Sequence, residues 1–188
     1  IIPRVVHDLA RENDWRIPEH FDDTWTPVLD YNIDEPAHPF EPYGATVGHA
    51  LEWSRLVVTL RATLLAGGRD APAWMLDAAV ALFDRAVADG WAVDGADGFV
   101  YTTDWDGRPV VRTRMHWVVA EAICAAAALH EATGEAAYDV AFACRVGVLD
   151  GRHPALRDEA LARIASMLTP SGRLFVDTGT PLREVTLP

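Results

Sequence analysis

The sequence predicts an all-α fold of antiparallel helical hairpins, arranged as part of a toroid. Between residues 45 and 146, long helix-compatible runs alternate with loops, and no strands recur at the spacing of a βαβ unit. Half of the 188 residues are hydrophobic, so a sizeable core can form. A ring of twelve helices needs roughly 300 residues with loops of ordinary length, so this chain supplies about half of such a ring.

The chain begins with three segments of different character. Residues 3–13 have the pattern of the end of a helix, and residues 15–21 alternate weakly and contain a proline, which predicts a short extended piece. Residues 22–42 form a long polar loop that carries Trp25, Tyr31 and four prolines. A loop of this length inside a compact domain is more often functional than not.

Four helices are predicted after this loop. The first spans residues 45–66 and ends at a Gly-Gly pair, and the second spans residues 72–89, with an aspartate before it as an N-cap. Residues 95–111 contain Asp-Gly pairs between short β-like runs, which predicts a hairpin that turns at Asp106-Gly107. Residues 112–132 and 135–146 are predicted as the third and fourth helices.

The tail departs from this helical pattern. Residues 154–167 predict a helix, a Pro-Ser-Gly turn follows, and residues 173–176 predict a strand. This order is typical of α/β folds and does not continue the helical hairpins. We therefore divide the chain into a partial toroid domain over residues 1–146 and a divergent tail over residues 147–188.

The composition excludes several classes of function. The net charge is −12 and all sixteen basic residues are arginines, so neither a Schiff-base lysine nor a P-loop lysine exists here. Nucleic acids and anionic membranes both bind basic patches, so neither is expected as a partner. No signal peptide or stretch of about 18 apolar residues is apparent, which predicts a cytoplasmic protein. A start on isoleucine, not methionine, predicts an incomplete chain.

The sequence also lacks the common motifs of disulfide, metal-binding and serine-hydrolase sites. Cys124 and Cys144 form no CxxC pair, and Cys124 lies in an apolar run that predicts core packing. No HxH or HExxH spacing occurs, so we expect no obligatory metal and no cofactor. Ser54 lies outside any GxSxG motif, which argues against a serine hydrolase.

A candidate site lies at the start of the helix predicted over residues 45–66. His49, Glu52 and Trp53 are spaced at i, i+3 and i+4, so a base, an acid and an aromatic ring share one helix face. Histidine titrates near neutral pH and can move a proton. The alternative is an ordinary His–Glu pair on a helix surface.

A second candidate cluster opens the helix predicted over residues 112–132. Trp117 and Glu121 share a face at i, i+4, and His116 precedes them. An aromatic plane beside a carboxylate is a common way to hold a sugar, because C–H faces stack on the ring and hydroxyls bond to the carboxylate. The alternative is a tryptophan packed between helices, with Glu121 in solvent.

Several blocks of the sequence together resemble a known family. They resemble the N-acylglucosamine 2-epimerase superfamily, and within it most closely the mannose isomerase branch of aldose–ketose isomerases. The resemblance covers residues 15–138, and its blocks are EHFDDTW (19–25), DYN (30–32), PYGATVGHALEWSRL (42–56) and TTDWDGRPVVRTRMHWVVAEAI (102–123).

This resemblance implies a fold, a reaction and a site. The fold is an (α/α)6 toroid, and the reaction is metal-free proton transfer between C1 and C2 of a free monosaccharide through a cis-enediol, which turns mannose into fructose. His49 of the GHxxEW motif is the implied catalytic base, and Glu52 is its partner. The implied substrate-binding residues are Tyr43, Trp53, His116, Trp117 and Glu121.

Other activities remain open at this point. An N-acylglucosamine or aldose 2-epimerase protonates the opposite face and needs a second acid, and the family's second catalytic histidine has no match in residues 139–188. A carbohydrate hydrolase would use two carboxylates, such as Glu52 with Glu121 or Asp104. An inactive sugar-binding fragment would expose apolar inner surface and form homo-oligomers or aggregates.

Overall fold

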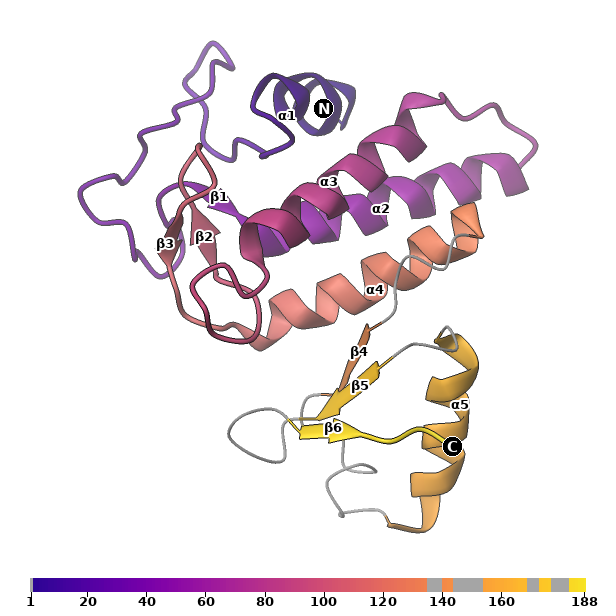
Figure 1. Ribbon diagram of the computed structural model, residues 1–188. Coiled ribbons are helices and arrows are strands. Elements are labelled where there is room, and N and C mark those ends of the chain that lie inside the picture. The colour runs from indigo at the N-terminus through magenta and orange to yellow at the C-terminus, as the bar shows by residue number, and fades with distance from the viewer. Residues whose placement is uncertain (1, 135–139, 144–153, 169–172, 177–182) are drawn as a thin grey trace. The chain divides into compact units, whose positions relative to one another are not determined.

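The structure is a computed structural model, and it describes residues 2–134, 140–143, 154–168, 173–176 and 183–188 (Figure 1). By its contacts the chain divides into two compact units, Ile1–Ala132 and Thr133–Pro188. The compactness of a unit does not by itself define a domain. The predicted domain boundary near residue 146 therefore stays a prediction.

The first unit begins with the helical stretch that the sequence predicts over residues 3–13. It is π-helical over Pro3–Leu9 (η1) and α-helical over Ala10–Glu12 (α1). Asp14 and Trp15 then adopt left-handed φ values of 56° and 64°. Because two such residues in succession cannot continue a right-handed helix, the chain turns away here.

The predicted polar loop over residues 22–42 is confirmed. It consists of turns, and an isolated bridge between Phe21 and Pro27 closes its first part. A residue outside the loop also holds it in place: the indole Nε1 of Trp105 donates a hydrogen bond to the carbonyl oxygen of Leu29 at 2.6 Å. A segment that is rich in turns is thereby held against the hairpin that contains Trp105.

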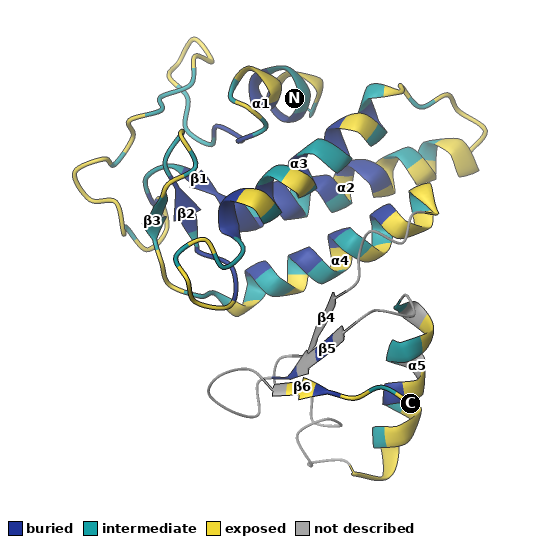
Figure 2. Ribbon diagram, viewed as in Figure 1, coloured by how far each residue is buried: buried dark blue, intermediate teal, exposed yellow. Residues whose placement is uncertain are grey.

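The centre of the unit is a hairpin of two long helices, α2 (Val47–Ala66) and α3 (Trp74–Gly90). They run antiparallel in Figure 1, and they confirm the two helices predicted over residues 45–66 and 72–89. Figure 2 shows the buried residues concentrated where α2 and α3 meet. The loop that joins the two helices reverses at Gly68, whose φ of +68° suits a residue without a side chain.

A small antiparallel sheet lies at the start of α2. The predicted hairpin is present as β2 (Thr102–Thr103) and β3 (Pro109–Val111), and β1 (Ala45–Thr46) pairs with β2 as a third strand. Gly44 precedes β1 with a φ of +94°, and a Cβ there would lie 2.0 Å from the carbonyl oxygen of Thr103. Only glycine therefore permits this close approach of the two chain segments.

The third long helix, α4 (His116–Thr133), begins four residues later than the predicted start at residue 112. Val111 is still part of the sheet, and the side chain of Arg114 binds Asp94 in the preceding loop, with Nη1 and Oδ2 2.9 Å apart. Cys124 is exposed on α4, so the prediction that it packs in the core is wrong. The helix turns a different face inward, through buried Val118, Ala122, Ala125 and Leu129.

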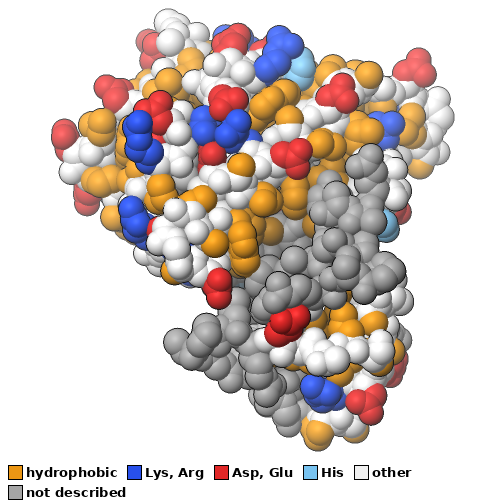
Figure 3. All heavy atoms as spheres, viewed as in Figure 1, with side chains coloured by type: hydrophobic (Ala, Val, Ile, Leu, Met, Phe, Trp, Pro, Cys, Tyr) orange, Lys and Arg blue, Asp and Glu red, His pale blue; other side chains and the backbone are white. Residues whose placement is uncertain are grey.

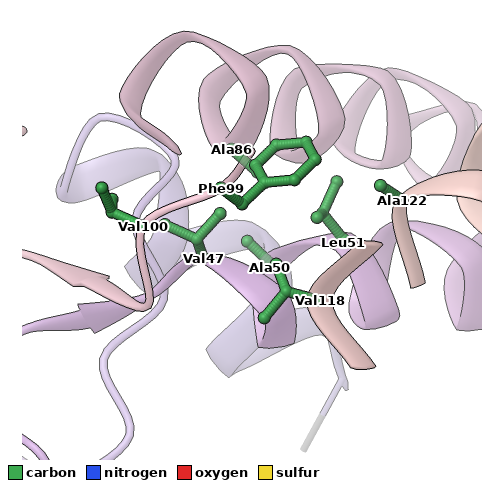
Figure 4. Packing of buried hydrophobic residues seen from close by; sticks show 8 residues of the cluster. All are labelled: Val47, Ala50, Leu51, Ala86, Phe99, Val100, Val118 and Ala122. Carbon is green, nitrogen blue, oxygen red and sulfur yellow. The ribbon is translucent and has the colours of Figure 1, made fainter. Parts of the chain in front are cut away.

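The three helices and the loop before the sheet share one hydrophobic core (Figure 4). Leu51 from α2, Ala86 from α3 and Val118 from α4 all contribute to this core, and the ring of Phe99 completes it. The remaining members of the buried cluster are Val47, Ala50, Val100 and Ala122. The core therefore lies directly beneath the first turns of α2 and α4, where both candidate clusters of polar residues begin.

A buried ion pair joins the N-terminal segment to this framework. The Nε of Arg16 donates to Oδ2 of Asp89 at 2.7 Å, and its Nη1 donates to the carbonyl oxygen of Trp105 at 3.0 Å. Arg85 also reaches Asp89, at 3.3 Å. A Cβ at Gly107 would lie only 2.7 Å from Arg16 Nη2 and 2.9 Å from Asp89 Oδ1, so this glycine leaves the room that the pair occupies.

In its described residues, the second unit contains a sheet of three strands and one α-helix. Its strands are β4 (Val140–Ala143), β5 (Arg173–Val176) and β6 (Arg183–Val185), with β4 parallel and β6 antiparallel to the central β5. The helix is α5 (Arg157–Met167), preceded by the 3₁₀ turn η2 (Pro154–Leu156). A small core of Leu161, Leu174, Val176 and Val185 holds the unit together.

The tail helix over residues 154–167 and the strand over residues 173–176 are confirmed. The helix predicted over residues 135–146 is wrong for residues 140–143, which form β4, and the rest of that prediction lies outside the described residues. The sequence of β4, Val-Ala-Phe-Ala, is a short apolar run that suits either structure. Its pairing with β5 selects the strand.

The surface of the first unit carries charges of both signs. On the face shown in Figure 3, acidic and basic side chains are interspersed and do not form separate fields. Within the described residues, no helix is both long and apolar enough to cross a membrane.

Candidate active site

His49 lies in the first turn of α2, where several elements meet. The backbone N–H of Val47 donates to the carbonyl oxygen of Tyr101 at 3.1 Å, and β1 pairs with β2 just before the helix. The start of α2 is therefore fixed to the hairpin that follows α3. The side chain of His49 is 41% exposed, so its ring can reach a ligand while its position stays defined.

Glu19 is the carboxylate that contacts the His49 ring. Its Oε1 lies 2.9 Å from His49 Nδ1, and its Oε2 accepts a hydrogen bond from the hydroxyl of Thr46 at 3.3 Å. Oε1 is buried, and among the described residues it contacts the imidazole at ion-pairing distance, while no donor reaches it with ideal hydrogen-bond geometry. This contact joins the segment before the polar loop to the first turn of α2.

The charges around His49 favour its protonated form. The direct contact with Glu19 is the largest cause that raises the pKa of His49 above its usual value; burial opposes this, and the charges of Glu19 and Glu52 add to the increase. Glu52 was the expected partner of the imidazole. In the structure it acts on His49 as a nearby charge, whereas Glu19 makes the direct contact.

The indole ring of Trp117 lies beside the His49 ring. The ring centroids of Trp117 and His49 are 5.3 Å apart, and the Tyr101 ring meets the indole edge-on, with centroids 6.1 Å apart. A Cβ at Gly48 would lie 2.3 Å from the indole atoms Cη2 and Cζ3. Burial, and then the charge of Glu19, raises the pKa of Tyr101, so its hydroxyl stays protonated at neutral pH.

Glu121 on α4 forms an ion pair with Arg55 on α2. Nε of Arg55 lies 2.9 Å from Oε2 of Glu121, and Nη2 lies 3.3 Å from Oε1, so the ion pair is bidentate. The hydrogen bond to Glu121 raises the pKa of Arg55, and burial opposes it. Both side chains are partly exposed. The pair holds α2 and α4 together and also presents a donor and an acceptor next to the site.

The other predicted site residues differ in exposure. Tyr43 and Trp53 are partly buried, whereas His116 is exposed at the first position of α4. The structure thus brings His49 and Trp117 together directly. The roles predicted for Tyr43, Trp53, His116 and Glu121 stay predictions.

An open pocket of about 510 Å³ lies next to Glu19. Its aromatic and acidic lining comes from the polar loop and the residues just before it: Glu19, His20, Phe21, Asp22, Asp23, Trp25 and Tyr31. The His20 and Tyr31 rings stack with centroids 4.0 Å apart. Within the described residues, no three histidine, cysteine, aspartate or glutamate side chains converge as a metal site.

Sequence reasoning did not select Glu19 as a site residue. No periodicity links Glu19 to His49, because the contact joins segments thirty residues apart. The signal that pointed to it was its position in the EHFDDTW block, immediately before the long loop.

Comparison with known proteins identifies the family of this chain. Residues 1–153, well over half of the chain, match the sequence profile of the family described as N-acylglucosamine 2-epimerase (GlcNAc 2-epimerase). The chain belongs to this family. The resemblance seen in its sequence blocks is thereby confirmed.

Two D-mannose isomerases are similar to this chain in sequence. The chain is 58% identical over 134 residues to D-mannose isomerase from Thermobifida fusca, covering 71% of this chain and 32% of that protein. It is 49% identical over 144 residues to D-mannose isomerase from Pseudomonas cannabina pv. alisalensis, covering 77% and 35%. The chain thus spans about a third of the length of these curated relatives.

A solved structure supports the same relationship. A crystal structure of D-mannose isomerase superposes with a TM-score of 0.65 at 30% identity, covering 72% of this chain and 33% of that one. The predicted fold class, a helical (α/α)6 toroid type present in part, is confirmed by this match.

Proposed function

We infer that this chain carries part of a sugar isomerase site in which His49 moves a proton between C1 and C2 of mannose to give fructose. The observation that carries the proposal is the placement of the His49 ring, between a carboxylate at 2.9 Å and the indole of Trp117 at 5.3 Å. The names of the relatives add support, since those matched above are D-mannose isomerases. A protein of this kind needs a base, a second proton carrier and an aromatic surface.

The proposed reaction balances with one base. Neutral His49 removes the proton from C2 of the open-chain sugar, and the electrons of that bond form the C1–C2 double bond while negative charge moves to O1. In this deprotonated cis-enediol, the Glu52 carboxylate takes the proton of O2 and passes it to O1. O2 then becomes the ketone oxygen as C1 receives the proton from His49. General acid–base action of this kind contributes about 10² to 10⁴ in rate.

The neighbouring residues have complementary roles in this proposal. Glu52, one turn beyond His49, carries the proton between O1 and O2. The indole of Trp117 stacks on the C–H face of the sugar, with Tyr43 and Trp53 at its edges. Glu121 and His116 bond to sugar hydroxyls, and Arg55 fixes the orientation of Glu121.

Proton NMR of mannose in D2O with the purified chain tests the proposal. We expect fructose to appear and deuterium to enter at C1 or C2, and we expect His49→Ala to abolish both. His130→Ala is the matched control, because it removes an exposed histidine near the end of α4 and should leave exchange unchanged. Exchange that persists in His49→Ala would refute the assignment of the base.

The family description favours one second function, 2-epimerisation. An epimerase returns the proton to C2 from the opposite face, so mannose would give glucose and no fructose in the same NMR experiment. Because the chain spans about a third of its relatives, a third outcome is a sugar-binding fragment. Saturation transfer from protein to mannose without deuterium exchange would identify it.

A further inference from the structure

Two segments that are distant in sequence converge on the His49 ring. Glu19 comes from the stretch before the polar loop, and Trp117 comes from α4. Of these, only Glu19 reaches a ring nitrogen, with Oε1 2.9 Å from Nδ1. The carboxylate itself is held, since its Oε2 accepts from the hydroxyl of Thr46 at 3.3 Å.

We propose that Glu19 is a positioning residue that keeps the proton of His49 on Nδ1, so that Nε2 is the nitrogen that exchanges protons with the sugar. This inference rests on the proposed function, because it names the atom that does the work of His49. It also assigns a role to a residue that lies outside the GHxxEW motif.

The chemistry of the two groups determines which nitrogen is free. An ionised carboxylate only accepts hydrogen bonds, so the ring nitrogen that faces it must carry a proton. In a neutral imidazole the other nitrogen then has the lone pair. Oε1 of Glu19 is buried, and among the described residues the His49 imidazole is the cationic group within ion-pairing distance of it. A loss of the Nδ1 proton would therefore place a nitrogen lone pair against this oxygen at 2.9 Å, which is unfavourable.

The charged groups that face His49 come from several elements. Glu19 precedes the polar loop, Glu52 lies on α2 itself, and both favour the imidazolium, with Glu19 as the larger cause. Tyr101, before β2, is kept neutral by burial and by the charge of Glu19. The α4 side contributes the uncharged indole of Trp117. Glu19 therefore sets both the tautomer of His49 and most of its preference for the charged form.

This arrangement has a consequence for the reaction. His49 must lose a proton to act as a base, so the acid limb of the exchange rate follows its pKa. The carboxylate that orients the ring also moves this limb to higher pH. Removing the charge of Glu19 should move the limb to lower pH and weaken the orientation, so the rate at the plateau should fall.

NMR of the histidine ring nitrogens tests the inference without any turnover. In the wild-type chain, we expect neutral His49 to be protonated on Nδ1 and its pKa to lie above about 6.5. In Glu19→Gln, the pKa should fall toward the ordinary value. Glu52→Gln is the matched control, since it removes a carboxylate that makes no direct ring contact and should change the pKa less.

Three results would overturn the inference: an Nε2-protonated neutral ring in the wild type, an unchanged pKa in Glu19→Gln, or an equal fall in both variants. If Glu19→Gln does not fold, Glu19→Asp keeps the charge and withdraws it by one methylene, and a smaller shift is expected. Deuterium exchange measured beside the NMR separates the two proposals. An Nδ1-protonated His49 without exchange in the wild type would refute the role of Nε2 and the isomerase together, whereas exchange with an unchanged pKa in Glu19→Gln would refute Glu19 alone.

Discussion

The indole ring of Trp117 lies against Gly48 so closely that residue 48 has no room for a side chain. A Cβ there would lie 2.3 Å from two atoms of the ring, well inside van der Waals contact. Gly48 is followed directly by His49, whose ring centroid is 5.3 Å from that of Trp117. Gly48 therefore determines how closely the indole of Trp117 can approach His49.

Gly48→Ala should displace Trp117 and destabilise the first unit. Overpacking costs about 1–3 kcal/mol, whereas alanine favours a helix over glycine by about 1 kcal/mol, so a measured loss reports the clash. Urea unfolding gives the stability and NMR gives the deuterium exchange rate, and both should fall. In the control Gly67→Ala, the new Cβ lies 3.4 Å from the carbonyl oxygen of Thr63, an ordinary contact, and both should stay near wild type. Equal behaviour of the two variants would contradict this reading of Gly48.

Arg16→Met should destabilise the protein strongly. The Arg16 side chain is 7% exposed and its Nε lies 2.7 Å from Asp89, so its removal leaves a buried carboxylate with fewer partners. Breaking a buried pair costs about 3–5 kcal/mol, and Arg85 should keep the loss at the lower end. Arg108→Met is the control, because Arg108 is 73% exposed in its contact with Asp106, and urea unfolding should detect little change. A small loss in Arg16→Met would show that the buried pair contributes little.

The stabilisation that Glu19 provides through His49 should depend on pH. The folded-state pKa of His49 is raised, mainly by Glu19, so the stabilising contribution is complete below the unfolded value of about 6.5. It is lost as pH rises through the higher folded-state pKa. The difference in unfolding free energy between the wild type and Glu19→Gln, measured by urea from about pH 6 to pH 9, should therefore shrink with rising pH. A constant difference would mean that Glu19 acts on stability without His49.

Trp105→Phe should loosen the polar loop more than it destabilises the fold. The substitution keeps an aromatic ring but removes the Nε1 donor that binds the carbonyl oxygen of Leu29 at 2.6 Å. A hydrogen bond of this kind contributes about 1 kcal/mol, and its loss should appear as faster amide exchange in residues 22–42. Trp25→Phe changes an indole that is 53% exposed and should leave the exchange near wild type. Unchanged exchange in Trp105→Phe would show that the loop is held by other contacts.

The local signals of the sequence were sufficient for the long helices. Gly-Gly, the prolines and the Asp-Gly pairs mark chain reversals by themselves, so α2, α3 and the hairpin could be placed within a few residues. The strand β1 could not, because it has two residues and exists only through its pairing with β2. The strand β4 was read as helix, since four apolar residues carry no period and only the partner strand selects the structure.

The candidate site shows the same division. The i, i+3 spacing placed His49 and Glu52 on one helix face, and a shared motif pointed to Trp117. The contact between Glu19 and His49 depends on how the N-terminal segment returns to α2, which no local pattern encodes. Arg55 was missed for a similar reason, because its partner Glu121 lies on another helix.

The buried meeting of Arg16, Asp89 and Gly107 has an evolutionary consequence. A larger residue at position 107 would enter the space of the guanidinium, and a neutral residue at position 16 would leave the carboxylate with fewer partners. A single change at position 16 or 89 therefore leaves a buried charge with fewer partners, whereas a concerted change of both to apolar residues need not destabilise the protein. Gly107 is constrained in any case, because its φ of +85° disfavours a side chain. Among homologous proteins, we therefore expect these three positions to be retained or replaced together. We expect them to be substituted less often than the residues of the exposed loop beside them.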